Sequence, residues 1–425
     1  MGSSTTVVIL AAGKGTRMKS ATPKVLQPLL GRPMLAWVLD AARALDPAKI
    51  VLVLGHQAAE VEAAARGLVG DVAFEAVIQE PQHGTGHAVQ VAASALGHDP
   101  GEVVVLYGDM PLLRGASLCA LVDARRDLGP GGLALLVADA DDPRGYGRIL
   151  RDAQGDVVDI VEQKDATGEQ LDITEINPGV YAFDGAALLA DLPRLTNANA
   201  QGEYYLTDLL ALAVAAGRSV ADVAIEPLEA LGVNTLEQLA EVRAVLQFRV
   251  LEQHLANGVR IEDPHTTFID HGVEIGADTT ILPCTVIRAG VRIGAGCEVG
   301  PFAHLRVGTT LADAAVLGNF CESKHTTLGP GSKAKHLTYL GNAEIGARTN
   351  IGAGTVFANY DGRAKHTTEV GAGVFIGSGT IIVAPNKLPD GVMTAAGAVV
   401  TRSAVLQPNE VWAGLPARRL RARSE

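Results

Sequence analysis

A glycine-rich loop with basic residues is the first feature of this sequence that could do chemistry. Residues 10–18 read L-A-A-G-K-G-T-R-M, directly after a short aliphatic run, and Lys24 follows shortly beyond. Glycines let backbone N–H groups approach a phosphate closely, while Lys14, Arg17 and Lys24 can neutralise its charge. The spacing matches neither a Walker loop nor G-x-G-x-x-G. A plain glycine turn is the alternative, but the basic residues favour a phosphate-binding loop.

An aspartate, Asp109, ends a second hydrophobic run at Tyr107-Gly108-Asp109. A carboxylate there is well placed to hold Mg²⁺ against phosphate oxygens, although a turn or helix-capping aspartate is the simpler alternative. Two histidines, His83 and His87, stand four residues apart, as in some zinc motifs. Glycines surround them and H-E-x-x-H is missing, so a loop that closes on a base or sugar is favoured over zinc.

A polar cluster surrounds His336 in the second half of the sequence. Carboxylate, lysine, tyrosine and asparagine side chains lie near it in the chain, among them Glu322, Lys324, Tyr339 and Asn350. An isolated surface histidine is ordinarily only solvated, whereas this one lies where a regular repeat is interrupted. The cluster therefore predicts a functional site.

These residues need elements that position them, and in the first half strands alternate with helices. Strands are predicted at 7–10, 50–54, 72–78 and 103–106, and helices at 33–44 and 58–66. The alternation is typical of a Rossmann-like α/β domain, with a mostly parallel sheet covered by helices on both faces. Because ligands bind beyond the carboxyl ends of such strands, the loops after Leu10 and Leu106 are the expected binding loops.

The second half repeats every six residues. The aliphatic positions are Ile269, Ile275, Ile281, Ile287, Ile293, Val299, Leu305, Leu311 and Leu317. The register slips over residues 321–340, and the period then resumes at Ile345, Ile351, Phe357, Val370, Ile376 and Ile382. A six-residue period fits no helix and predicts a left-handed parallel β-helix of hexapeptide repeats.

A long helix is predicted to join the two halves. Thr235 and Gln238 form a T-x-x-Q capping pattern, aliphatic residues recur at helical spacing, and Asn257-Gly258 ends the helix after Ala256. We therefore expect an N-terminal domain at 1–228, a linker at 229–257, the β-helix at 258–404 and a tail at 405–425.

The composition excludes several classes of protein. With 425 residues, 48% of them hydrophobic and 19% charged, the chain is globular. A net charge of -12 argues against nucleic-acid binding, and no apolar run approaches the roughly 20 residues that span a membrane. The four cysteines form no C-x-x-C pair and no charged and apolar leader opens the chain, so we expect a cytoplasmic protein.

The ordered motifs of the chain resemble one enzyme family over about residues 7–400. In order, they are L-A-A-G-K-G-T-R-M, P-K-V-L, H-G-T-G-H-A, Y-G-D-M-P-L, G-Y-G-R, E-Q-K-D-A, E-I-N and Q-G-E-Y-Y-L-T-D. Together they resemble the bifunctional N-acetylglucosamine-1-phosphate uridyltransferase/glucosamine-1-phosphate N-acetyltransferases. Each motif is shared with other sugar nucleotidyltransferases, whereas the ordered set is specific. The resemblance implies a role in bacterial envelope precursor synthesis.

The resemblance implies a uridyltransferase site in the first half. Arg17 and Lys24 would engage the UTP phosphates, and Asp109 and Asn234 would bind Mg²⁺. The remaining contacts to UTP and N-acetylglucosamine-1-phosphate would come from Leu10, Ala11, Ala12, Gly13, Gln79, Gly84, Thr85, Tyr107, Gly108, Gly147, Glu162 and Asn177. The sugar phosphate would attack the α-phosphorus of UTP and release pyrophosphate. Such a transfer needs positioning and charge neutralisation more than a nucleophilic side chain.

The resemblance also implies an acetyltransferase site in the β-helix. His336, oriented by Glu322, would act as the general base that deprotonates the amine of glucosamine-1-phosphate. The sugar phosphate would be held by Arg306, Lys324, Tyr339 and Asn350, and acetyl-CoA by Ala353, Asn359, Tyr360, Ser378 and Ala396. A homotrimer is implied as well, because a neighbouring β-helix completes the acyl-donor site in such proteins.

Two features depart from the family's pattern. The repeat before Arg306 is shorter by roughly one to two coils of about 18 residues each. An arginine expected against the CoA phosphates has no clear counterpart, since Gly414 falls about there, and Arg418 or Arg419 is the candidate substitute. The arginine-rich stretch at 417–423 either folds over that groove or is a solvated terminus.

Two other functions stay open. One is a sugar-1-phosphate nucleotidylyltransferase alone, with the β-helix as a trimerisation or regulatory module. The other is a scaffold with inactive sites.

Overall fold

The computed structural model of the protein describes residues 4–422. The chain forms two compact units, Met1–Arg243 and Ala244–Glu425, and the division falls within helix α8 (Leu236–Ala256). It therefore lies inside the stretch predicted as a linker. Arg423, counted with the predicted tail, lies outside the described residues.

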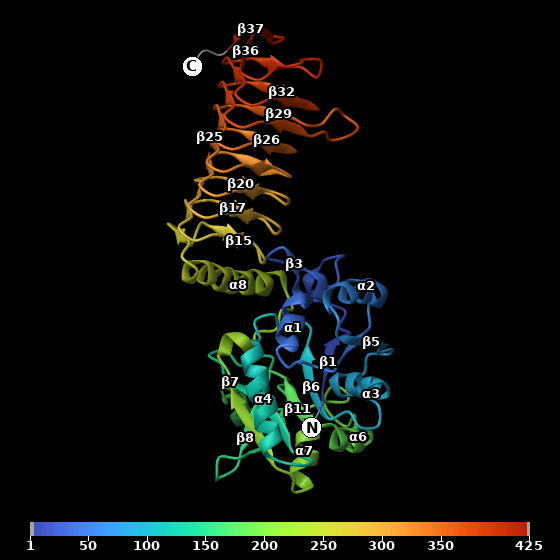
Figure 1. The fold of residues 1–425 in the computed structure, drawn as a ribbon. Coiled ribbons are helices and arrows are strands. Elements are labelled where there is room, and N and C mark those ends of the chain that lie inside the picture. Colours follow the sequence, from blue (N-terminus) through green and yellow to red (C-terminus); the bar gives the residue numbers. More distant parts are fainter. Residues whose placement is uncertain (1–3, 423–425) are drawn as a thin grey trace. The chain divides into compact units, whose positions relative to one another are not determined.

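The first unit is built on a ten-stranded mixed sheet (Figure 1). Its parallel part has the order β5 (Ala73–Ile78), β4 (Lys49–Leu54), β1 (Thr5–Ala11) and β6 (Glu102–Tyr107). The sheet continues with β11 (Tyr181–Asp184), antiparallel to β6 and to β7 (Leu133–Asp139), and then with β10 (Glu175–Asn177), β8 (Gly147–Arg151) and β9 (Val157–Val161). Strand β12 (Val220–Ala224) pairs with β7 in parallel. The predicted α/β domain and its parallel strands are confirmed.

Helices cover both faces of this sheet, because the side chains of a strand alternate between its faces. Val7 and Ile9 of β1 join the core formed with α1 (Met34–Arg43), α2 (Ala58–Leu68) and α4 (Gly115–Asp127). Val8 and Leu10 join the core formed with α3 (Thr85–Leu96), α6 (Gly185–Asp191) and α7 (Asp208–Ala215). The shorter elements are α5 (Gly168–Leu171), η1 (Thr16–Met18), η2 (Lys24–Leu26), η3 (Leu192–Arg194), η4 (Pro227–Ala230), β2 (Pro28–Leu29) and β3 (Arg32–Pro33).

Helix α8 begins as the capping pattern predicts. The backbone N of Gln238 donates to Oγ1 of Thr235 (3.2 Å). In return, Oε1 of Gln238 accepts from the backbone N of Thr235 (3.1 Å) and of Asn234 (2.8 Å). These bonds satisfy N–H groups that no helical carbonyl can reach, and they fix Asn234 directly before the helix.

The second unit is a parallel β-helix whose short strands stack into three sheets (Figure 1). The first sheet holds β13 (Arg260–Ile261), β16 (Thr280–Ile281), β19 (Glu298–Val299), β22 (Val316–Asn319), β25 (Lys333–His336), β28 (Asn350–Ile351), β31 (Phe375–Ile376), β34 (Met393–Thr394), β36 (Glu410–Ala413) and β37 (Arg418–Ala422). The second holds β14 (Phe268–Ile269), β17 (Val286–Ile287), β20 (His304–Leu305), β23 (Glu322–Lys324), β26 (Tyr339–Gly341), β29 (Val356–Ala358), β32 (Ile381–Val383) and β35 (Val399–Val400). The third holds β15 (Glu274–Ile275), β18 (Arg292–Ile293), β21 (Thr310–Leu311), β24 (Thr327–Leu328), β27 (Ala343–Ile345), β30 (Thr368–Val370) and β33 (Asn386–Leu388).

One residue of each coil strand points into the core of the β-helix, as the six-residue period predicts. The aliphatic series from Ile269 to Leu317 is buried, apart from the half-buried Ile275. The slip in register has a physical cause. Ser323 and Ala334 take inward places that larger aliphatic residues hold elsewhere, and the coils here become one residue shorter. The predicted left-handed β-helix therefore runs on through the polar cluster.

Two features depart from the regular coils of the second unit. A loop of residues 359–367 projects from the β-helix between β29 and β30 (Figure 1). At the end of the unit, β37 folds back antiparallel to β36.

Among residues 4–422, no helix combines the length and the apolar character that crossing a lipid bilayer requires.

Candidate active sites

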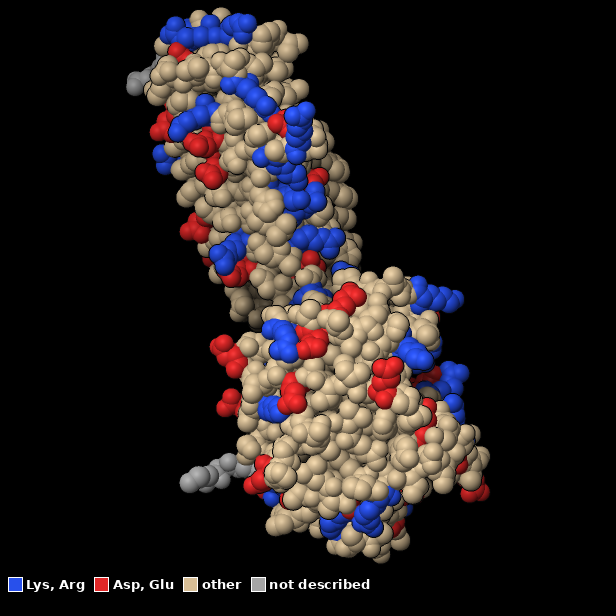
Figure 2. All heavy atoms as spheres, turned by 90° about the vertical axis from the view of Figure 1, so that its right-hand side faces the viewer, with Lys and Arg blue, Asp and Glu red and all other residues tan. Residues whose placement is uncertain are grey.

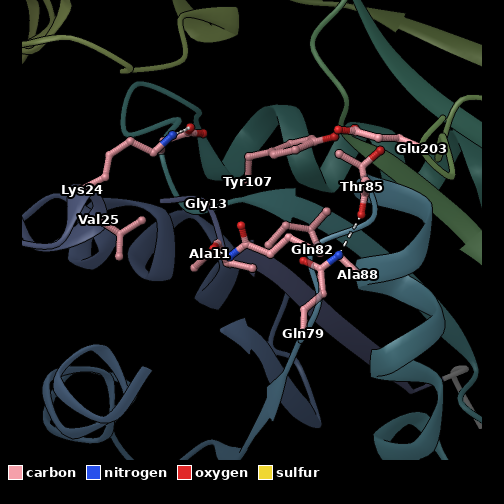
Figure 3. Close-up of a pocket in the computed structure, with 14 residues that line it drawn as sticks. Ala11, Gly13, Lys24, Val25, Gln79, Gln82, Thr85, Ala88, Tyr107 and Glu203 are labelled. Carbon is pink, nitrogen blue, oxygen red and sulfur yellow. Dashed lines mark hydrogen bonds and ion pairs between the residues drawn. The ribbon is translucent and has the colours of Figure 1, made fainter. Parts of the chain in front are cut away.

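A cavity of about 330 Å³ lies at the carboxyl ends of β1 and β6 in the first unit (Figure 3). Its wall includes ten of the predicted residues: Leu10, Ala11, Ala12, Gly13, Lys24, Gln79, Gly84, Thr85, Tyr107 and Asp109. Sequence reasoning missed four further lining residues, namely Val25, Gln82, Ala88 and Glu203. Each of these lies within or directly beside a recognised motif, and that adjacency is the signal that could have found them.

Two side chains of the cavity wall, Lys24 and Asp109, form a cluster with Arg17 and Asn234, which lie outside the wall. Lys24 Nζ forms an ion pair with Asp109 and donates to Oδ1 of Asn234 (3.2 Å), which also accepts from Nη2 of Arg17 (2.8 Å). Asn234 is brought there because the backbone N of Val233 donates to the carbonyl oxygen of Asp109 (2.9 Å). The side chains of Lys24 and Asp109 are only 13% and 17% exposed, so water screens their attraction weakly. Two cationic side chains and two side-chain oxygens that could bind a metal ion thus converge at a site suited to nucleotide phosphates.

Close backbone contacts explain how these groups reach one another. Gly15 has a left-handed backbone (φ 60°), and a Cβ atom there would lie 2.9 Å from Cβ of Lys24. Glycine is therefore required where the loop turns back over Lys24. The backbone N of Gly108 donates to the carbonyl oxygen of Leu10 (2.9 Å), which ties the ends of β6 and β1 together.

The loop of residues 83–87 closes another part of the cavity. Gln79 Nε2 donates to the carbonyl oxygen of Gly84 (2.8 Å) and lies 3.2 Å from Nδ1 of His87. Gly84 has a φ of 101°, and a Cβ atom there would lie 2.6 Å from the carbonyl oxygen of Tyr204. Burial and the nearby His83 lower the pKa of His87, so its imidazole is neutral at pH 7. The loop is therefore closed by packing and by the bond between His87 and Gln79.

Six residues that the sequence predicted as part of the site lie outside the cavity wall: Arg17, Gly108, Gly147, Glu162, Asn177 and Asn234. Glu162 nonetheless acts on a residue of the wall, since burial and the charge of this carboxylate raise the pKa of Tyr107. Burial also raises the pKa of Glu162, which accepts from Oγ1 of Thr207 (3.3 Å). Tyr107 thus connects the cavity to Glu162.

Asn177 supports Tyr107 instead of reaching the cavity. Its Nδ2 donates to the hydroxyl of Tyr181 (2.7 Å), and its Oδ1 accepts from the backbone N of Gly179 (2.9 Å). At Gly179, a Cβ atom would overlap the ring of Tyr107. The side chain of Asn177 therefore holds the turn on which Tyr107 rests.

In the second unit, His336 ends strand β25 and is bonded to Asn319. Their register on β25 and β22 places them side by side, and Nδ1 of His336 lies 2.7 Å from Oδ1 of Asn319. Because an amide oxygen can only accept, Nδ1 carries the proton of this bond, and in the neutral imidazole the lone pair is then on Nε2. Glu322, which was predicted to orient His336, pairs instead with Arg306 at 2.7 Å, so the bond that holds the imidazole in this structure is the one to Asn319. In a β-helix a side chain meets its neighbour in register one coil away, which here is Asn319.

Three cations gather on the same unit: Arg306, Lys324 and Lys365. The positive charges of Lys365 and Arg306 lower the pKa of Lys324. Lys365 comes from the loop of residues 359–367, and sequence reasoning missed it. With Glu322 paired to Arg306, the cluster keeps an excess of positive charge, which suits an anion such as phosphate. Figure 2 views the face from which the loop projects, and Lys and Arg side chains gather along that face of the β-helix.

Tyr339 and Asn359 come together over Gly341, where a Cβ atom would collide with both side chains. Asn359 Nδ2 also donates to Oδ1 of Asn342 (2.7 Å). Asn350 lies on β28, the strand next to the one that carries His336. The predicted sugar-phosphate residues are thus distributed over neighbouring coils of this unit.

Ala353, Ser378 and Ala396 form a column on successive coils. The backbone N of Gly379 donates to the carbonyl oxygen of Ala353 (2.7 Å), and that of Gly397 to the carbonyl oxygen of Ser378 (2.8 Å). Tyr360 stands apart from this column in sequence, on the projecting loop, where it is 60% exposed. The column thus brings together three of the residues predicted to contact acetyl-CoA.

The column leads to the hairpin that holds both candidate arginines. Arg418 lies opposite Ala413 at the turn of the hairpin, and its guanidinium donates to the carbonyl oxygen of Ala417 (3.3 Å). Arg419 is tied instead to Glu410, with Nε 2.7 Å from Oε1. Residues 418–422 of the predicted tail form a strand, and of the two candidates in the described part of the chain Arg419 has a carboxylate partner, whereas Arg418 is bonded to a carbonyl oxygen.

Comparisons with known proteins match both units. Residues 7–254 match the MobA-like NTP transferase domain, and residues 272–307 match the bacterial transferase hexapeptide (six repeats). Relatives named bifunctional protein GlmU are 44% identical in Pelobacter propionicus, 45% in Nocardia farcinica and 46% in Alkalilimnicola ehrlichii. These alignments cover 93%, 95% and 94% of this chain and 93%, 89% and 92% of the relatives. The chain belongs to the GlmU family.

Membership of the GlmU family confirms the resemblance drawn from the motifs. The protein is a bifunctional enzyme, with an N-acetylglucosamine-1-phosphate uridyltransferase half and a glucosamine-1-phosphate N-acetyltransferase half. The alignments with GlmU relatives cover 93% and 95% of the chain, so they extend over both units. An inactive scaffold is therefore set aside.

Proposed function

We propose that the first unit binds UTP in its cavity with the phosphates against Lys24 and Arg17. The position at the carboxyl ends of β1 and β6 and the convergence of these two cations support this. Attack of a sugar-phosphate oxygen on the α-phosphorus builds up negative charge, and cations already fixed in place stabilise that charge without reorganising. The α-phosphorus gains a bond to the sugar phosphate, and its bond to the leaving pyrophosphate breaks.

The groups around Lys24 also fit Mg²⁺. In phosphoryl-transfer sites this ion is held by one or two carboxylates together with substrate phosphates. Asp109 offers one carboxylate, and Asn234 offers an amide oxygen beside it, both on Lys24 Nζ. When bound, Mg²⁺ supplies charge neutralisation at the phosphate oxygens. Lys24 holds these two oxygen ligands side by side by donating to both of them.

In the second unit, His336 acts as the general base for acetyl transfer. Its Nε2 takes the proton from the amine of glucosamine-1-phosphate while the nitrogen attacks the thioester carbon of acetyl-CoA, and the thiolate of CoA then leaves. Asn319 keeps Nδ1 protonated, which leaves Nε2 as the basic atom. Arg306, Lys324 and Lys365 hold the phosphate of the sugar.

Acetyl-CoA lies along the column of Ala353, Ser378 and Ala396, because small side chains leave room there for the donor. Arg418, at the hairpin turn beyond this column, supplies the cation for the CoA phosphates in place of the arginine that the family pattern expects.

The protein works as a homotrimer. Phe302, Phe320 and Leu337 stand on successive coils with 52%, 55% and 61% of their surface exposed, and the two phenyl rings stack 5.1 Å apart. Contact with other copies would remove this apolar surface from water. A cytoplasmic location fits the four unpaired cysteines among the described residues.

The bond between His336 and Asn319 carries the acetyltransferase proposal, and the two activities of the chain allow a reciprocal test. Release of CoA thiol reports acetyl transfer, and release of pyrophosphate reports uridylyl transfer. We expect His336→Ala to lower acetyl transfer by about 10²- to 10⁴-fold and to keep uridylyl transfer. Lys24→Ala should do the reverse. Wild-type protein with uridylyl transfer alone would instead support the rival function, a nucleotidylyltransferase with the β-helix as a trimerisation module.

A further inference from the structure

One carboxylate, that of Asp361, braces the loop of residues 359–367 from within. Its Oδ1 accepts from the backbone N of Arg363 (2.9 Å) and of Ala364 (2.8 Å), and its Oδ2 lies 2.7 Å from Nε2 of His366. Nη2 of Arg402, on a later coil, lies 3.5 Å from the same Oδ2. The carboxylate therefore closes the turn of the loop and also ties the loop to the β-helix.

The loop has the form of a hairpin. The backbone N of His366 donates to the carbonyl oxygen of Asn359 (2.8 Å), and Tyr360 and Lys365 form an antiparallel bridge. Lys365 thus lies on the returning arm of the hairpin, directly after the turn that Asp361 closes. The place of Lys365 depends on the shape of that turn.

The returning arm brings Lys365 to Lys324. The chain rejoins the β-helix at Thr368, whose backbone N donates to the carbonyl oxygen of Asn342 (2.9 Å). The backbone N of Asn342 in turn donates to the carbonyl oxygen of Lys324 (3.0 Å). The charges of Lys365 and Arg306 both act on Lys324 and lower its pKa. Because like charges repel, this grouping persists only where the fold holds each cation in place.

We propose that Asp361 is a positioning residue of the acetyltransferase, which closes the loop of residues 359–367 and so holds Lys365 beside Lys324 and Arg306 for the phosphate of the sugar substrate. The inference rests on the proposed function of the second unit. Asp361 acts through Lys365 and contacts neither reacting group. Its loss lets repulsion move Lys365 away from the other cations, which weakens binding of the phosphate and spares the proton transfer at His336.

Steady-state acetyl transfer separates these two effects. We expect Asp361→Ala to raise the KM for glucosamine-1-phosphate by about tenfold, the effect of losing one charge-assisted contact, while kcat changes by less than about threefold. Asp361→Asn keeps an oxygen for the two backbone N–H groups, so its KM should lie between those of the wild type and Asp361→Ala. Asp313→Ala is the matched control, because Oδ1 of Asp313 also accepts from a backbone N, that of Ala295 (2.9 Å), on another corner of the β-helix. It should leave this KM unchanged.

A double-mutant cycle shows whether Asp361 acts through Lys365. We expect Lys365→Ala to raise the same KM by about tenfold, and Asp361→Ala to add nothing further in that background. Fully additive effects, or an unchanged KM in Asp361→Ala, would overturn the proposal. A fall in kcat at constant KM would overturn it as well.

Two readouts keep this outcome separate from a failure of the proposed function or of folding. Uridylyl transfer by the same preparations reports an intact chain. If the wild type shows no acetyl transfer, the acetyltransferase proposal fails. Calorimetric titration with glucosamine-1-phosphate then still tests the positioning role, which predicts weaker binding to Asp361→Ala than to Asp313→Ala.

Discussion

Replacing Asn319 by alanine removes the hydrogen bond that holds the imidazole of His336. The bond spans 2.7 Å, and under the proposed mechanism it becomes charge-assisted when His336 accepts the proton of the substrate amine. Hydrogen bonds to charged groups contribute about 1.5–3 kcal/mol, and the exposure of His336 places this one near the lower end, at about 1.5–2 kcal/mol. Because about 1.4 kcal/mol corresponds to a tenfold change in rate, we expect kcat of acetyl transfer to fall by about 10- to 30-fold.

The assay is thiol release at saturating acetyl-CoA and glucosamine-1-phosphate, with uridylyl transfer measured on the same samples. Asn319→Asp keeps an acceptor for Nδ1 and should retain more activity than Asn319→Ala. In the His336→Ala background, Asn319→Ala should change nothing further, because the bonded partner is already gone. Full acetyl-transfer activity in Asn319→Ala would refute the role given to Asn319. A further 10- to 30-fold loss of kcat on adding Asn319→Ala to His336→Ala would refute it as well.

Three other predictions concern different parts of the chain. Arg418→Ala should raise the KM for acetyl-CoA by about tenfold but leave the KM for acetyl-pantetheine, which lacks the nucleotide phosphates, unchanged. Arg419→Ala should alter neither KM, and a higher KM for acetyl-CoA in Arg419→Ala than in Arg418→Ala would contradict this assignment. Phe320→Asp places a charge on the exposed apolar corner, so sedimentation should show species smaller than a trimer together with reduced acetyl transfer, and an intact trimer would exclude that corner as the interface. Burial, aided by nearby carboxylates, raises the pKa of Asp208 from 3.8 to about 6. A raised carboxyl pKa costs stability as the pH rises through that window, so Asp208→Asn should raise the Tm at pH 7 more than at pH 4, and an equal gain at both would count against this cause.

Local patterns in the sequence predicted the structure correctly where the stabilising contacts join residues that are close in the chain or repeat from coil to coil. The capping pattern of Thr235 and Gln238 predicted the start of α8, because its bonds join residues only three positions apart. The six-residue period predicted the inward side chains of the β-helix for the same reason, since each coil repeats the same short strand. Where small residues, Ser323 and Ala334, took inward places, the aliphatic pattern was lost although the coils continued.

The sequence by itself determined the two units, and it predicted the phosphate-binding loop and His336 as the general base. Only the tertiary structure decided which side chains are bonded to one another in the two sites. Asn319 is the group bonded to His336, 17 residues away, and a change of one residue in coil length would put another side chain there. Arg17 and Asn234 are bonded across 217 residues. Hydrogen bonds and ion pairs depend on separations of a few ångströms, and the stacking of coils and strands sets those separations, so side-chain types and spacing alone cannot give them.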